Sequence, residues 1–289
     1  MPNLKEIKTR IKSVKNIEQI TKAMKMVAAA KVKKVQDRVA AFRPYSEKIQ
    51  EVFSNLSSKL DGEDISDPLL KAREVKTMGL VIVTSDKGLC GSYNSSLIRF
   101  ALAEIKKLES QGFKVKLWLI GNKSFGAFKY TGHEVIEKYS QLPQIPTTTE
   151  ANMIQESVIE NYLSGNVDKV VFVYTKFVSM MTFKPSLLDL VPASKPENAS
   201  ESMAQYLFDP DVATMMSAIV PKYIEAQILR ALLESSASEL ASRMTAMSSA
   251  SKNAKEMISS LNLVYNKVRQ AAITKEILEV VGGAEALEK

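Results

Sequence analysis

The sequence contains a single cysteine, Cys90, and a single histidine, His133. One cysteine cannot form a disulfide within the chain, and two such residues are too few for a zinc site built from cysteine and histidine. No window approaches the run of about 18 apolar residues that a membrane span requires, and residues 1–8 carry no apolar signal core. We therefore expect a soluble chain that is not exported, without structural zinc, cofactor or dithiol chemistry.

Glycine and proline are almost absent from both ends of the chain. Pro44 is the only one of either type in residues 3–61, and residues 222–281 contain neither. Nine of the eleven glycines lie in residues 62–165. Two stretches without breakers thus flank a middle segment with ordinary turns, which predicts a long helix at each end.

The last stretch has residues at alternating steps of four and three, the pattern of a coiled-coil seam. This seam consists of Leu233, Ala237, Leu240, Met244, Met247, Ser251, Ala254, Ile258, Leu261, Tyr265, Val268 and Ala272. The first stretch carries a looser version, made of Leu4, Ile7, Ile11, Val14, Ile20, Met24, Val27, Val32, Val35, Val39 and Phe42. We expect Pro44 to bend or break the first helix. Because the two stretches match in length, we predict an antiparallel pair within the chain, in which residue i faces roughly residue 283 − i, to within about a heptad.

Strands and helices alternate in the middle of the chain. Strands are predicted at 78–84, 115–121 and 169–174, helices at 97–108 and 150–163, and an edge strand within 177–191. This alternation predicts a mostly parallel, Rossmann-like sheet with helices on both faces. The fold class is therefore a mixture of α+β and α/β, in which a long antiparallel coiled coil of the terminal helices accompanies a Rossmann-like α/β domain. The expected parts are a coiled-coil helix at 1–61, the α/β domain at 75–191, a return loop at 192–210 and a second coiled-coil helix at 211–289.

No convincing catalytic site can be found in the sequence. Residues 85–92 follow the first predicted strand, where a doubly wound sheet binds nucleotides, but their glycines lack the spacing of a phosphate loop, so we interpret them as a structural turn. Cys90 and His133 have no third orienting group, and we interpret them as a buried small hydrophobe and a surface histidine. Asp86 and Asp189 are interpreted as solvated acids at strand ends.

The net charge of +7 is unevenly placed. Residues 1–60 hold 14 Lys and Arg against 5 Asp and Glu, a net +9 that leaves −2 for the rest. Such a segment suits nucleic acid, an anionic membrane surface or an acidic protein partner. Its lysines could follow a phosphate backbone, although no aromatic residue for base stacking precedes Phe42. A basic coiled-coil protein that binds nucleic acid is therefore the alternative function.

Several segments resemble one known family, the ATP synthase gamma subunits. Residues 273–286, Ile-Thr-Lys-Glu-Ile-Leu-Glu-Val-Val-Gly-Gly-Ala-Glu-Ala, fit the C-terminal signature of that family at every specified position. Further similarity lies in residues 17–31, 84–91, 206–210 and 265–271. The resemblance therefore runs nearly from end to end.

The resemblance implies that the chain is the central shaft of a rotary F-type ATP synthase and catalyses nothing itself. The coiled coil would stand inside the hexamer of alpha and beta subunits, and the α/β domain would sit with the epsilon subunit on the ring of c subunits. The complex would place the chain at the cytoplasmic face of a bacterial inner membrane, as a peripheral protein. Nucleic acid is not among the implied partners.

Site residues also follow from the resemblance. Arg269, Gln270 and Thr274 would make polar contacts with loops of an alpha and a beta subunit, and Met24 would lie in the packed region close by. At the other end, Tyr206, Phe208 and Asp209 would belong to a foot that faces the c ring and epsilon.

The sequence departs from the family pattern in two places. Ser92 stands where many relatives carry a second glycine. The linker from Val191 to Tyr206 is short and has no cysteine. This linker predicts that the dithiol insert of plastid relatives is absent.

Overall fold

The computed structural model describes residues 3–57, 67–193 and 212–287. The helices are α1 (Leu4–Ser57), α2 (Tyr93–Ser110), α3 (Asn122–Phe128), α4 (Thr148–Leu163) and α5 (Val212–Leu287). The strands are β1 (Thr77–Val83), β2 (Lys114–Ile120), β3 (Glu134–Tyr139), β4 (Lys169–Phe177) and β5 (Phe183–Val191). The chain divides into two compact units, residues 29–243 and residues 1–28 with 244–289.

Residues 29–243 contain one five-stranded sheet in the order β3-β2-β1-β4-β5. The pairs β1–β2, β1–β4 and β2–β3 are parallel, and only β5 runs antiparallel, at one edge beside β4. This sheet confirms the predicted fold class, including the edge strand that contains Pro185. The short elements α3 and β3 were not predicted.

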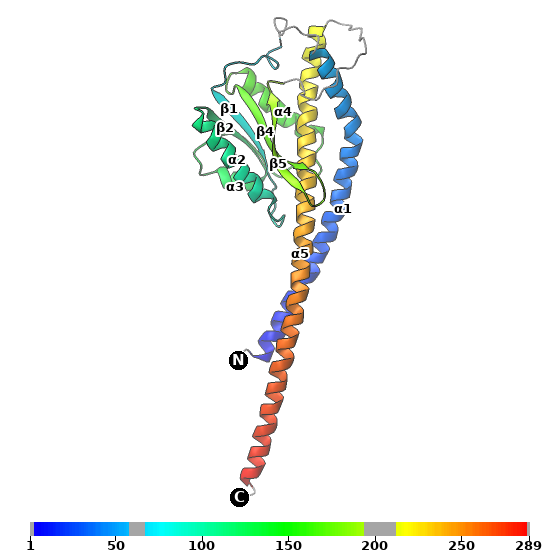
Figure 1. Ribbon diagram of the computed structural model, residues 1–289, viewed down its shortest axis with the longest axis vertical. Helices are drawn as coiled ribbons and strands as arrows, with labels where there is room; N and C mark the ends of the chain where they lie inside the picture. The colour runs from blue at the N-terminus through cyan, green and yellow to red at the C-terminus, as the bar shows by residue number, and fades with distance from the viewer. Residues whose placement is uncertain (1–2, 58–66, 194–211, 288–289) are drawn as a thin grey trace. The chain divides into compact units, whose positions relative to one another are not determined.

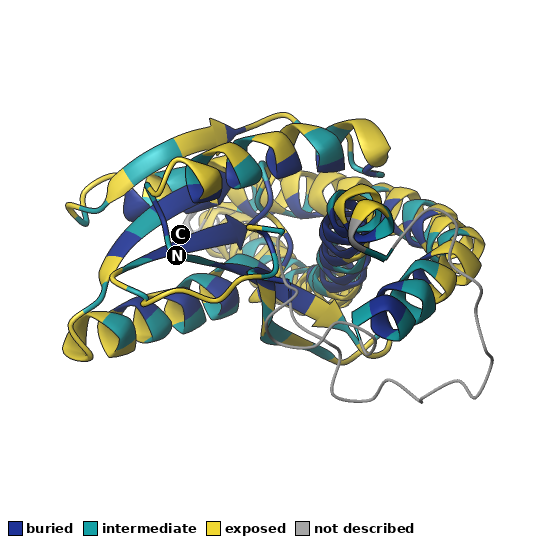
Figure 2. Ribbon diagram, turned by 90° about the horizontal axis from the view of Figure 1, so that it is seen from above, coloured by how far each residue is buried: buried dark blue, intermediate teal, exposed yellow. Residues whose placement is uncertain are grey.

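Helices cover both faces of the sheet (Figure 1, Figure 2). On one face, alternate residues of the central strands pack against α2, where Leu97, Ala101 and Ile105 are buried, and against Phe128 of α3. On the other face, the strands pack against α4 and against the parts of α1 and α5 that belong to this unit. Because both faces are covered, β1 is an almost uninterrupted apolar run rather than an alternating one.

Trp118 lies at the centre of the second face and is fully buried. Its indole Nε1 donates to Ser157 Oγ of α4 at 3.0 Å, which satisfies the only polar atom of the ring. A Cβ atom at Gly79 on the neighbouring strand would lie 2.6 Å from the indole ring. Glycine is therefore required at position 79 by the size of the tryptophan beside it.

A polar network closes the amino edge of the sheet. Asp168 accepts hydrogen bonds from the amides of Lys76 and Thr77, at 2.9 and 2.8 Å, and its second oxygen lies 2.9 Å from Arg73 Nε. The Arg73 guanidinium also lies over the ring of Tyr162, 4.4 Å from its centroid. These contacts fix the segment that enters β1 against the loop that precedes β4.

The other unit pairs the first part of α1 with the last part of α5. In residues 251–284 of α5, the residues that are not exposed are Ser251, Ala254, Ile258, Leu261, Tyr265, Val268 and Ala272, all of them predicted seam positions. In residues 3–28 of α1, the residues that are not exposed are Leu4, Ile7, Ile11, Val14, Glu18, Thr21, Met24 and Ala28. Both helices therefore bury one narrow stripe, as a coiled coil requires.

The seam of α1 differs from the prediction at two positions. Ile20 and Val27 are 59% and 55% exposed, and the buried positions beside them are Thr21 and Ala28. Thr21 can occupy the seam because its hydroxyl donates to the Ile17 carbonyl of its own helix at 2.9 Å. The more apolar residues were expected to mark the seam, but continuity of the heptad from Val14 decides which face is buried.

The observed pairing sums lie below the predicted value of 283, one at the limit of the expected tolerance of about a heptad and the other three residues beyond it. Phe53 stacks on Tyr223, which gives 53 + 223 = 276, and Glu18 lies 4.0 Å from Lys255, which gives 18 + 255 = 273. The offset of seven to ten residues arises because α5 begins at Val212, before Pro221, and because α5 continues beyond the residues that pair with Leu4. Two stretches that lack glycine and proline over the same length can therefore belong to helices of different length, which end at different places along the pair.

Neither proline breaks its helix. Pro44 lies inside α1, and Pro221 lies inside α5. The Pro221 carbonyl accepts a hydrogen bond from Gln155 Nε2 at 2.8 Å. Of the two outcomes expected at Pro44, a bend or a break, the break does not occur, because packing of the surrounding turns on the core outweighs local helix propensity. A bend at Pro44 stays a prediction.

The predicted divisions at 1–61, 75–191, 192–210 and 211–289 stay predictions. Most of the return loop lies outside the described residues. Within the described ranges, no helix has a stretch long and apolar enough to traverse a lipid bilayer.

Candidate functional site

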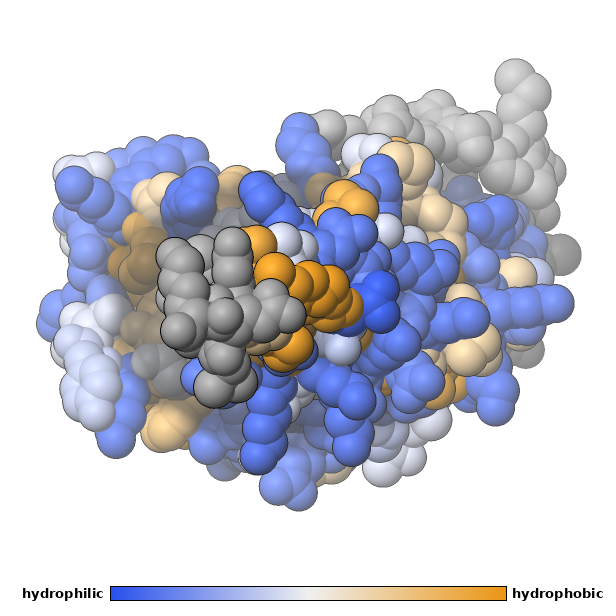
Figure 3. Space-filling model, turned by 90° about the horizontal axis from the view of Figure 1, so that it is seen from below, coloured by the Kyte–Doolittle hydropathy of each residue, from blue (hydrophilic) through white to orange (hydrophobic). Residues whose placement is uncertain are grey.

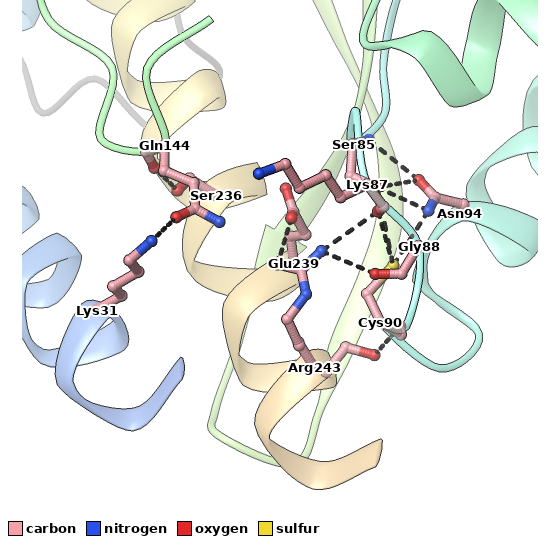
Figure 4. Close-up of polar contacts among 11 residues, drawn as sticks. Lys31, Ser85, Lys87, Gly88, Cys90, Asn94, Gln144, Ser236, Glu239 and Arg243 are labelled. Carbon is pink, nitrogen blue, oxygen red and sulfur yellow. Dashed lines mark hydrogen bonds and ion pairs between the residues drawn. The ribbon is translucent and has the colours of Figure 1, made fainter. Parts of the chain in front are cut away.

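Two groups of the residues singled out in the sequence lie in different units. The turn at residues 85–92 lies at the carboxyl edge of the sheet, where α5 packs (Figure 4). Arg269, Gln270, Thr274 and Met24 lie in the paired helices of the other unit.

The turn after β1 is held by its own side chains. Ser85 Oγ donates to the Lys87 carbonyl at 2.7 Å, and Asn94 Oδ1 accepts from the Ser85 amide at 3.0 Å. Cys90 is buried, as predicted, with its Sγ atom 3.1 Å from Asn94 Nδ2. The backbone turns back at Leu89, which has φ of +61° although it is not glycine. This arrangement agrees with the interpretation of the segment as a structural turn.

His133 and Cys90 are not brought together. His133 Nε2 lies 3.0 Å from Glu109 Oε1, and Nδ1 lies 2.8 Å from Thr131 Oγ1. The imidazole is therefore partly buried between the end of α2 and the start of β3, rather than the free surface group that was expected. The nearest polar partners of Cys90 are Ser85 and Asn94, which supply no base.

Asp86 and Asp189 are also separate. Asp86 accepts from the amides of Asn122 and Gln141 at 3.0 and 2.9 Å. The carboxylate therefore joins the loops that follow β1, β2 and β3, which corrects its interpretation as a solvated acid. Asp189 lies at the sheet edge, half exposed, in an ion pair with Lys169 at 2.8 Å.

A cavity of about 570 Å³ lies beside these loops and α5. Its polar lining includes Thr84, Asp86, Tyr93, Ser236 and Glu239. The hydroxyl of Thr84 donates to the Ile120 carbonyl, both oxygens of Asp86 accept backbone amides, and Ser236 donates to the Gln144 carbonyl. Thr84, Asp86 and Ser236 therefore bind other groups of the protein at the wall of this cavity.

Glu239 and Arg243 of α5 form the main charged contact at this edge. Their side chains are 14% and 9% exposed, and Arg243 Nη1 lies 2.5 Å from Glu239 Oε1. Burial raises the pKa of the Glu239 carboxyl above its ordinary value even though the Arg243 guanidinium acts in the opposite direction. Sequence reasoning missed this pair. The available signal was an acid and a base four residues apart, each immediately before a seam residue.

In the other unit, the three polar candidates are all exposed. Arg269 and Gln270 are adjacent in α5, and Thr274 Oγ1 donates to the Gln270 carbonyl at 3.0 Å. Met24 of α1 is partly buried and lies in the seam. The guanidinium and the amide side chain therefore face outward and can contact a partner chain.

The end of α5 has no internal cover. Every residue from Ile273 to Ala284 is exposed, although this segment includes Ile277, Leu278 and Val280. Apolar surface is visible around this end of the helix (Figure 3). Exposed apolar side chains gathered on one helix are typical of a surface that another chain covers.

The fold thus defines a class of proteins in which helices from the two ends of one chain pair with each other and an α/β domain lies between them in the sequence. A family model described as ATP synthase matches residues 3–287. The ATP synthase gamma chain of Gloeothece citriformis is 44% identical, over 99% of this chain and all of the relative, and that of a Cyanothece species is 42% identical over the full length of both. The chain belongs to the ATP synthase gamma chain family.

Solved structures give the same result. The chain resembles the central stalk and c-ring structure of the mitochondrial ATP synthase of Tetrahymena thermophila, with a TM-score of 0.59 and 28% identity, over 80% of this chain and 99% of that one. A chain of the Euglena gracilis mitochondrial ATP synthase has a TM-score of 0.66 at 18% identity, over 98% and 94% of the two chains, and supports the fold.

Proposed function

We propose that this chain is the central rotor shaft of an F-type ATP synthase, which couples ion-driven rotation of the c ring to ATP synthesis and hydrolysis. The paired helices stand inside the alpha and beta subunits, and the α/β domain contacts epsilon and the c ring. The family membership supports this role.

The uncovered end of α5 is the observation that carries the proposal. An exposed helix with Ile277, Leu278 and Val280 on its surface needs an enclosing partner. The outward apolar residues of α1, Ile17, Ile20 and Val27, add to the same need. In the proposed complex, the ring of alpha and beta subunits would cover these residues.

The chain performs no catalysis in this proposal. Its paired helices are chemically different around their circumference, so three otherwise equivalent catalytic sites contact three different surfaces at any moment. Rotation then changes which site binds ADP and phosphate and which releases ATP. The chain acts by differential contact with those states, which is the only way in which one part of a protein complex shifts the equilibrium of another.

Arg269, Gln270 and Thr274 are proposed to contact loops of the alpha and beta subunits, with Met24 beside them. Their exposure in this chain supports such contacts. Tyr206, Phe208 and Asp209 are proposed to face the c ring and epsilon, and they lie outside the described residues. The complex would hold the chain at the cytoplasmic face of a bacterial inner membrane.

A rotation experiment tests the proposal. A cysteine in place of Leu102, an exposed residue of α2, accepts a probe while the buried Cys90 stays unlabelled. In the complex purified from its host and fixed through the alpha and beta subunits, MgATP should drive continuous rotation of that probe in one direction. Recovery of the chain without alpha and beta subunits, or bound to nucleic acid, would contradict the proposal.

A further inference from the structure

Polar side chains in residues 235–243 of α5 contact β4, the turn after β1 and the loop after β3. Figure 4 shows the contacts with the turn after β1 and with Gln144 in the loop after β3. Ser235 Oγ accepts from the Thr175 amide at 3.3 Å, and Ser238 Oγ donates to the Thr175 carbonyl at 3.2 Å, at β4. Ser242 Oγ donates to the Cys90 carbonyl at 2.6 Å, in the turn after β1. Ser236 donates to the carbonyl of Gln144, beyond β3.

Arg243 completes this set. Its Nη2 atom donates to the carbonyls of Lys87 and Gly88, at 3.3 and 3.2 Å, while its Nη1 atom lies against Glu239. Arginine suits this position because its planar guanidinium carries several donors in a fixed fork. One side chain therefore joins the turn after β1 to a buried carboxylate one helical turn away.

These contacts differ in kind from the apolar seam. Apolar side chains can slide or repack with a small change in free energy, whereas hydrogen bonds to carbonyls are directional and weaken steeply when the angle changes. The bonds come from serine and arginine side chains on one sector of α5. They therefore define one rotational position of α5 against the sheet.

We infer that Arg243 and Glu239, with Ser242, form a torsional lock that prevents α5 from turning relative to the α/β domain when torque passes between them. This inference rests on the proposed rotor function. In the rotor, the catalytic subunits exert torque on α5, and the c ring exerts torque on the α/β domain. If α5 turned relative to the α/β domain at this junction, fewer ions would be moved per ATP made or hydrolysed, although the chemistry of the catalytic sites would not change. Arg243 and Glu239 are thus positioning residues.

The test compares Arg243→Gln, Glu239→Gln and a matched control, Arg230→Gln. Arg230 also lies on α5 and pairs with an acid four residues away, Glu234 at 3.0 Å, but it makes no recorded bond to the turn after β1 within the described residues. Hydrogen exchange of the purified full chain reports on the junction itself. The amides of Ser85, Tyr93 and Asn122 donate hydrogen bonds in or to the turn after β1. Both lock variants should exchange these three amides roughly tenfold faster than the wild type, and the control should not.

The second measurement uses the assembled complex in inverted membrane vesicles. A potential-sensitive dye records ion pumping, and ATP hydrolysis is measured in the same vesicles. In both lock variants, pumping per ATP hydrolysed should fall roughly threefold or more, while hydrolysis and the amount of assembled complex stay near the wild type. Arg243→Lys, which keeps the charge but loses the fork, should give an intermediate loss.

The outcomes separate the two claims. Unchanged exchange of the Ser85, Tyr93 and Asn122 amides in both variants would show that no lock exists. Faster exchange with undiminished pumping per ATP would show that torque does not pass through this contact. If one variant fails to assemble, the other still tests the inference, because each variant removes a different partner of the Arg243–Glu239 ion pair. Failure of the rotor proposal would give a different result. Vesicles from cells that lack this chain would then pump ions as well as wild-type vesicles.

Discussion

The ring of Phe53 in α1 stacks on the ring of Tyr223 in α5, with centroids 4.1 Å apart and planes 8° apart. This contact sets the register of the two helices in the unit formed by residues 29–243. Both rings belong to the continuous core that also covers the sheet. The pairing of the helices is therefore fixed by the same core that fixes the α/β domain.

The register can be tested by cross-linking. In a Cys90→Ser background, cysteines at Val39 and Ala237, whose numbers sum to 276 as for the stacked rings, should be joined within one chain by a short bis-maleimide. The pair Val39 and Met244, which corresponds to the sum of 283, should react much more slowly. Faster reaction of the second pair, or products formed only between two chains, would contradict this register. The measurement is the rate of the mobility shift in denaturing electrophoresis.

Gly121 should tolerate no side chain. It has φ of +87°, and a Cβ atom there would lie 2.3 Å from the Thr84 carbonyl oxygen, which is backbone and cannot move aside. Gly121→Ala should therefore destabilise the purified chain by about 4 kcal/mol or more in urea unfolding. Gly112 is the matched control, because its φ is +89° but no atom lies within 4 Å of its Cβ position. Gly112→Ala should cost only about 1 kcal/mol, and equal losses in the two variants would argue against the close approach.

Asp168 should make the stability of the chain depend on pH in the acid range. Burial raises the pKa of this carboxyl, but the amides of Lys76 and Thr77 and the Arg73 guanidinium outweigh burial, so the pKa lies below its ordinary value. A lowered carboxyl pKa stabilises the fold above the unfolded pKa of about 3.9, and this stabilisation is lost as the pH falls through the folded value. Asp168→Asn should therefore cost about 1–3 kcal/mol at pH 7, and the difference from wild type should shrink in strong acid.

The control for this measurement is Asp189→Asn. Asp189 is half exposed and pairs with Lys169 at the sheet edge, so its loss should cost no more than about 1 kcal/mol. Free energies of unfolding from urea titrations at several pH values provide the comparison. A constant difference between Asp168→Asn and wild type from pH 7 to strong acid would show that the charge of Asp168 does not stabilise the fold.

The exposed pair at the end of the coiled coil should affect coupling rather than folding. Replacing Arg269 and Gln270 together by alanine should leave thermal stability of the purified chain within about 0.5 kcal/mol of wild type, because both residues are exposed. In the assembled complex, ATP turnover and ion-driven synthesis should fall several-fold, because each increase of about 1.4 kcal/mol in the activation free energy lowers the rate tenfold. Asn262→Ala, at another exposed position of α5, should change neither. Unchanged synthesis and hydrolysis in the double variant would show that these residues make no functional contact.

Local patterns in the sequence predicted much of this molecule. The seam of α5 from Ser251 to Ala272 was predicted residue by residue, because a heptad repeat records which face of a helix is buried. The strands at residues 78–84, 115–121 and 169–174 were predicted because strands buried on both faces are continuous apolar runs. The C-terminal signature at residues 273–286 placed the chain in its family, although no physical pattern alone would have done so.

What the sequence determined by itself was therefore the type of each long element and the buried stripe of α5. Only the tertiary structure decided the register of α1 against α5, the burial of Thr21 in place of Ile20, and the meeting of Arg243 with the turn after β1. Each of these depends on contacts between residues far apart in the chain. Periodicity within one helix is set by its own 3.6-residue turn, whereas register and long-range hydrogen bonds are set by the sum of all packing across the core, which no single segment contains.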